Sequence, residues 1–85
     1  MSDALADIRA RLDAIDAQLV ALLAERASAV GHAWQYKDAH GLAHRDPERE
    51  AAIATRLAEL SDAHGLDRAA VAQIFAQIVG RDLRS

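Results

Sequence analysis

The sequence contains no cysteine, one proline, four glycines and one each of tryptophan, tyrosine and phenylalanine. Without cysteine the chain cannot form a disulfide, which favours a reducing cytoplasmic environment. So few aromatic residues and a net charge of -3 leave neither the stacking side chains nor the basic face that nucleic-acid binding needs. There is no apolar run near the roughly 18 residues of a membrane span, and no secretory leader pattern. We therefore expect a soluble, cytoplasmic protein that binds neither nucleic acid nor membrane.

Large apolar side chains are also scarce. The hydrophobic content is 52%, but 21 of the 85 residues are alanine, which buries little area. A chain this short, with few large apolar residues and no disulfide, is marginally stable as a monomer. The composition predicts one small domain that is stabilised by oligomerisation.

The stretch Leu5 to Tyr36 predicts one long helix with an apolar seam. Its apolar side chains alternate at spacings of three and four residues, as in a helix packed along its length: Leu5, Ile8, Leu12, Ile15, Leu19 and Leu22. Ser2 or Asp3 can cap its beginning, and Gly41 can end it in the left-handed conformation. A helix of about 37 residues would be about 55 Å long.

Two shorter helices, each of about 17 residues, are predicted to follow. Asp46 before Pro47 is typical of a helix N-terminus, and Gly65 ends this helix. Asp67 can cap the third. Because no strand pattern or repeat is present, the predicted fold class is all-α, with one long N-terminal helix and two shorter ones.

The lengths of these helices predict a second chain. Two helices of about 25 Å cannot together cover a helix of about 55 Å on several sides. A symmetric homodimer is the simplest closed arrangement that covers the long helix.

A cation interrupts the apolar seam. Arg26 takes the position after Leu22, and the seam resumes at Ala29. Burying an unpaired guanidinium costs several kcal/mol, so an anion from the protein or from a ligand is expected to meet it. Lys37 lies 11 residues further on, which is three turns to within about 20° and about 16 Å along the helix. Both long side chains can share one small anion.

Other charged residues can complete this pocket. Arg9 is 17 residues, about 25 Å, from Arg26, so only Arg9 of a second, antiparallel chain could share its ligand. After the Asp46 cap, Arg49 and Glu50 add a cation and a carboxylate to the backbone N–H groups of the helix terminus. These residues predict a pocket for a small dianion that carries a hydroxyl group.

Each of these residues also has a structural interpretation. Asp16 or Glu25 can form a salt bridge with Arg26, and Arg49 and Glu50 can be ordinary charges at a helix end. Hence the constellation, rather than any single residue, carries the functional interpretation.

The histidine pair and the aromatic pair are weaker signals. His40 and His44 are four residues apart but span the Gly41 turn, so a metal site between them is disfavoured. Trp34 beside Tyr36 is more typical of packing or of an interface than of cofactor stacking.

One combined pattern runs through nearly the whole chain: Ile8-Arg9, Leu12, Ile15-Asp16, Leu19, Leu22-Leu23, Glu25-Arg26, Lys37, Gly41, Asp46-Pro47-Glu48-Arg49-Glu50 and Gly65-Leu66-Asp67. This pattern closely resembles the all-helical chorismate mutases of the shikimate pathway. The resemblance implies that residues 1–85 form a single chorismate mutase-like helical domain, in an intertwined homodimer whose two active sites each use residues from both chains. It also implies the [3,3] rearrangement of chorismate to prephenate, with neither cofactor nor metal.

The resemblance assigns roles to the matching positions. Arg26, with Arg9 of the other chain, would bind the two substrate carboxylates. Lys37 would contact the ether oxygen and a carboxylate. Glu50 would contact the ring hydroxyl of the substrate, and Asp46 and Arg49 would line the pocket.

Two departures from the family pattern fall near the end of the sequence. Asp82 stands where the family commonly has a serine, and the sequence stops at Ser85, before a glutamine or glutamate that contacts the ether oxygen. The resemblance therefore implies weak catalysis by the isolated enzyme, with Asp82 near the substrate. Similar short-tailed bacterial relatives gain activity when they bind a DAHP synthase, the first enzyme of the shikimate pathway, which makes such an enzyme an expected partner.

Three alternatives stay open at this point. Isochorismate pyruvate lyases share the fold and several of the same cations, and an aminodeoxychorismate mutase is a further enzymatic alternative. A non-catalytic helical dimer that acts as a regulatory subunit belongs to a different class. Whether chorismate binds or reacts at all separates the last alternative from the enzymes.

Overall fold

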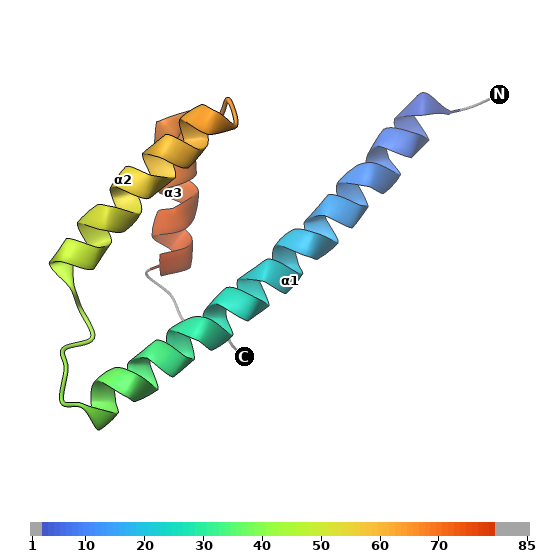
Figure 1. Cartoon of the computed structure of the whole chain (residues 1–85). Helices are drawn as coiled ribbons and strands as arrows, with labels where there is room; N and C mark the ends of the chain where they lie inside the picture. The colour runs from blue at the N-terminus through green and yellow to red at the C-terminus, as the bar shows by residue number, and fades with distance from the viewer. Residues whose placement is uncertain (1–2, 80–85) are drawn as a thin grey trace.

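The computed structural model describes residues 3–79, which form three helices (Figure 1). Helix α1 spans Ala4–Ala39, α2 spans Pro47–Ala63 and α3 spans Arg68–Val79. The described residues contain no strand. The predicted all-α fold, with one long N-terminal helix and two shorter ones, is confirmed. Any continuation of α3 toward its predicted length lies outside the described residues.

Local capping interactions set the helix ends where the sequence predicts them. The carboxylates of Asp3, Asp46 and Asp67 accept hydrogen bonds from backbone N–H groups in the first turns of α1, α2 and α3. Gly41 and Gly65 follow α1 and α2 with φ angles of +66° and +67°. A side chain at either position would strain the backbone, so glycine is the residue that ends these helices at least cost.

Helices α2 and α3 pack against each other, whereas α1 diverges from this pair (Figure 1). An ion pair between Asp62 and Arg68 ties the end of α2 to the start of α3. The hydrogen bond from the Arg68 guanidinium holds the pKa of the Asp62 carboxyl below its usual value. The α2–α3 pair is therefore a local unit within the chain.

The apolar residues of the described part of a single chain are exposed or only half-buried. None of the hydrophobic side chains within residues 3–79 is buried, and the side chains of the α1 seam between Leu5 and Leu22 are 41–58% exposed. The molecule measures 63 × 29 × 16 Å, and its radius of gyration is 16.9 Å, against about 12 Å expected for a compact chain of this length. None of the three described helices has the length and apolarity to cross a membrane.

Candidate functional site

Arg26 and Lys37 lie on one side of α1, at the edge of its partly covered face. This face occupies the C-terminal half of the helix and consists of one buried residue, Gly31, and half-buried neighbours: Leu23, Arg26, Ala27, Val30 and Lys37. At 100° per residue, both cations fall within about 60° of Leu22 around the helix axis. They therefore lie between the exposed seam and the covered face.

The structural interpretation of Arg26 is not realised within the described residues. Within residues 3–79, neither Asp16 nor Glu25 forms an ion pair with the Arg26 guanidinium. A half-buried guanidinium with no carboxylate nearby keeps its hydrogen-bond donors available for an anion.

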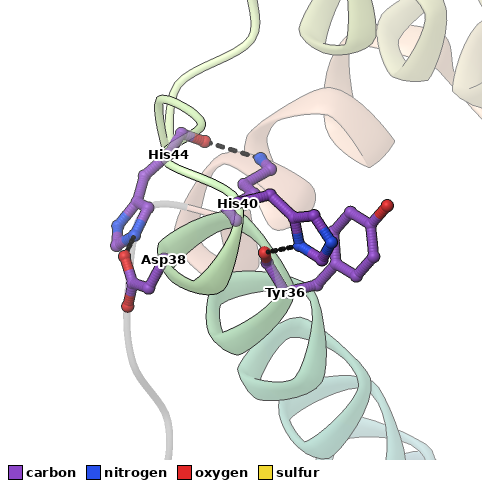
Figure 2. Close-up of polar contacts among 5 residues, drawn as sticks. Tyr36, Asp38, His40 and His44 are labelled. Atoms are coloured by element: carbon purple, nitrogen blue, oxygen red, sulfur yellow. Dashed lines mark hydrogen bonds and ion pairs between the residues drawn. The ribbon is translucent and has the colours of Figure 1, made fainter.

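Lys37 is held by the connection between α1 and α2. Its Nζ donates a hydrogen bond of 2.8 Å to the backbone carbonyl of His44 (Figure 2). An ammonium group has three N–H donors, so two are left for a ligand. The contact directs a half-buried cation toward the connection and toward the start of α2.

The His44 side chain is itself fixed by α1. Its Nε2 lies 2.5 Å from Oδ1 of Asp38, and its ring stacks on Trp34 with centroids 5.2 Å apart and an interplanar angle of 15°. The contacts of His44 with Trp34 and Asp38 were not predicted from the sequence. The Gly41 turn separates His44 from the helix, so helical periodicity does not relate its position to theirs. The only available signal was that Trp34 and Asp38 lie one turn apart on the same side of a helix.

His40 makes separate contacts on the other side of this helix end (Figure 2). Its ring stacks on Tyr36 with centroids 4.1 Å apart, and its Nδ1 lies 2.9 Å from the Tyr36 carbonyl oxygen. Figure 2 shows His40 with Tyr36 and His44 with Asp38 as two distinct pairs. Within the described part of the chain, no group of three or more potential metal ligands forms.

The start of α2 supplies the remaining predicted residues. Asp46 accepts the Arg49 backbone N–H at 3.2 Å as the helix cap, and the Arg49 side chain is exposed. Arg45 donates a hydrogen bond of 3.3 Å to Glu50. Because His44 and Arg45 are consecutive, the connection joins Lys37 of α1 to Glu50 of α2 through adjacent residues.

Arg9 and Asp82 are not placed with this group. Arg9 is exposed on the N-terminal half of the continuous α1, about 25 Å along the axis from Arg26. Asp82 and the end of the chain at Ser85 lie outside the described residues. One chain thus brings together only part of the predicted set.

A groove between α2 and α3 has a volume of about 600 Å³. Its charged lining residues are Glu50 and Arg68, and all the others are apolar: Ile53, Ala54, Leu57, Ala58, Ala69, Ala72, Phe75, Ala76 and Val79. Arg68 is already paired with Asp62, so two carboxylates placed against such a surface would find no cation that is not already in an ion pair. The groove is therefore suited to packing against an apolar helix and not to holding a dianion.

Comparison with known proteins gives one consistent result. A family model described as chorismate mutase type II matches residues 8–81. A chorismate mutase from Methanocaldococcus jannaschii is 34% identical over 79 residues, which cover 93% of this chain and 80% of that relative. No solved structure matches the chain significantly. The matched region includes every predicted site residue except Asp82.

Proposed function

Because this chain belongs to the type II chorismate mutase family, we propose that it is an isomerase that converts chorismate to prephenate. The observation that carries this proposal is the family match over residues 8–81, within which Arg26 and Lys37 project from one side of α1. The substrate is a dianion with a ring hydroxyl, and two cations beside a carboxylate suit that chemistry.

In the proposed mechanism the protein positions the substrate and stabilises developing charge. A pericyclic rearrangement needs no nucleophile and no proton transfer, so the rate comes from holding the compact reactive conformer. Arg26, together with Arg9 of the partner subunit, binds the two carboxylates. Lys37 stabilises negative charge on the ether oxygen as its C–O bond breaks.

The start of α2 completes the proposed site. Glu50, which the connection joins to Lys37 through adjacent residues, accepts a hydrogen bond from the ring hydroxyl. Asp46 and Arg49 line the pocket beside it, and Asp82 is assigned near the substrate by resemblance alone. No cofactor or metal takes part in this mechanism.

We further propose that the active unit is a homodimer in which a second copy covers the α1 seam. The chain exposes 7226 Å², whereas a folded monomer of 9.2 kDa should expose about 4,900 Å². The excess of about 2,300 Å² exceeds the roughly 800 Å² that a standard interface takes from each partner. The exposed seam and the apolar α2–α3 groove provide apolar surfaces for such packing, and the dimer also brings Arg9 to the site of the other chain.

A dimer of this kind should unfold in a concentration-dependent way. We expect the midpoint of thermal unfolding, followed by circular dichroism at 222 nm, to rise as the chain concentration is raised from about 1 to 100 μM, because dissociation and unfolding are coupled. Analytical ultracentrifugation of the same samples should show a dimer. A fully helical monomer at micromolar concentration would contradict the proposal.

The activity is tested with purified protein and chorismate. We expect the isolated protein to form prephenate above the uncatalysed rate but with weak turnover, as the two departures near the end of the sequence imply. When isochorismate is tested in parallel, neither salicylate nor pyruvate should form. Turnover of isochorismate alone would assign the lyase activity, and a dimer that neither binds nor converts either compound would indicate a regulatory subunit.

Two finer points stay predictions. A cytoplasmic location is expected from the lack of cysteine. A DAHP synthase is the expected activating partner, and adding one from the same source to the chorismate assay measures its effect on turnover directly.

A further inference from the structure

Beyond the backbone hydrogen bonds of Gly41 and Leu42 to the end of α1, the contacts between the α1–α2 connection and the side chains of α1 centre on His44. Three α1 side chains contact His44 by three different groups: Trp34 covers the face of its ring, Asp38 meets its Nε2, and Lys37 donates to its backbone carbonyl. Trp34 and Asp38 lie one turn apart on the same side of α1, so both can contact the His44 imidazole at once.

We propose that His44 is a positioning residue for Lys37, an inference that rests on the proposed function. Trp34 and Asp38 restrict the His44 ring, and the restricted ring in turn limits the position of the His44 backbone. The backbone carbonyl of His44 then accepts a hydrogen bond of 2.8 Å from the Lys37 ammonium. The lysine side chain has four rotatable bonds and would otherwise sample many rotamers. Held at one N–H, the ammonium presents its other two donors in a limited range of directions.

This role predicts an effect on the chemical step more than on substrate binding. The carboxylates of the substrate are held mainly by the arginines, whereas the charge that Lys37 meets on the ether oxygen develops only in the transition state. A group that is preorganised for that charge contributes to kcat, and its loss leaves KM nearly unchanged.

The main test is His44→Ala in the full-length enzyme with chorismate as substrate. We expect kcat to fall by about tenfold, with KM changed by less than about twofold. The matched control is His40→Ala, which removes the same side chain four residues away, together with its stacking on Tyr36. Because the contacts of the His40 side chain within the described residues are both to Tyr36, the control should keep wild-type kcat.

A double-mutant cycle separates positioning from general destabilisation. In a Lys37→Met background, His44→Ala should have no further effect on kcat, because the group that it positions is gone. Two conservative variants divide the contacts. His44→Gln keeps an N–H donor that can reach Asp38 and should retain more of kcat than His44→Ala, whereas His44→Phe keeps only the stacking on Trp34.

Trp34 provides a readout of the contact that does not depend on activity. It is the one tryptophan of the chain, so its emission reports directly on the stacked imidazole. We expect His44→Ala to change this emission and His40→Ala to leave it unchanged. If His44→Ala does not fold, Asp38→Ala provides the same test from the other side of the contact.

The outcomes are distinct. If the wild-type enzyme converts chorismate but His44→Ala and Asp38→Ala match His40→Ala in kcat, the positioning role is wrong, whatever the Trp34 emission shows. Equal losses from His44→Ala with and without Lys37 would also overturn it. If the wild type itself does not convert chorismate, the proposed function fails first.

Discussion

Arg26→Ala should lower kcat/KM for chorismate by about a hundredfold to a thousandfold, the loss typical of removing one charge-stabilising donor from an active site. The half-buried guanidinium has no carboxylate partner among residues 3–79, so its structural contribution is small and its removal leaves no uncompensated charge. The variant should therefore keep the helicity and the oligomeric state of the wild type.

The matched control for this prediction is Arg56→Ala. Arg56 is an exposed arginine on α2 that has no part in the proposed site, so its removal should leave kcat/KM within about twofold of the wild type. Circular dichroism and ultracentrifugation should accompany the assay. A variant that unfolds at position 26, while its folded fraction turns over normally, would identify Arg26 as a structural residue.

Mixing two inactive variants should restore activity if each site uses both chains. Arg9→Ala and Arg26→Ala remove residues that α1 holds about 25 Å apart within one chain, so each homodimer lacks one carboxylate ligand at both sites. In a heterodimer, one site contains both substitutions and the other contains neither. Random exchange makes half of the dimers heterodimers, which should restore about a quarter of wild-type activity.

Subunit exchange must be demonstrated independently in this experiment, for example with a tag on one variant. The control mixes Arg26→Ala with Lys37→Ala. These residues lie on the same α1 and are assigned to the same half of a site, so the two sites of their heterodimer each lack one cation. Proven exchange without recovery in the first mixture, or equal recovery in both mixtures, would contradict a site shared in the proposed way.

The sequence predicted the helices well because their ends depend on short-range interactions. Asp3 and Asp46 cap their helices through hydrogen bonds to residues two or three positions away, and Gly41 ends α1 through its own backbone conformation. The identity and position of these residues are therefore enough to place the helix boundaries. The common side of Arg26 and Lys37 follows in the same way from an unbroken helix. These features needed no knowledge of how the helices pack.

The contacts of the α1–α2 connection could not be predicted in this way. His44 meets Trp34 and Asp38 only because the backbone after Gly41 turns back along the helix end, and no periodic pattern encodes that path. The pairing of Arg45 with Glu50 depends on the same path. The apolar seam shows the opposite limit. Its spacing indicates that it must be covered, but residues 3–79 of a single chain do not cover it.

The divergence of α1 from the α2–α3 pair also has a consequence for the order of folding. The α2–α3 pair joins segments that are close in sequence, so it can form by rapid, unimolecular collapse. Most of the stability of a helix in a protein comes from packing of its apolar face, and the apolar seam of α1 is exposed in a single chain. We therefore expect α1 to become fully ordered in a later, bimolecular step. Until a newly synthesised chain binds a second copy, its exposed apolar seam is prone to aggregation.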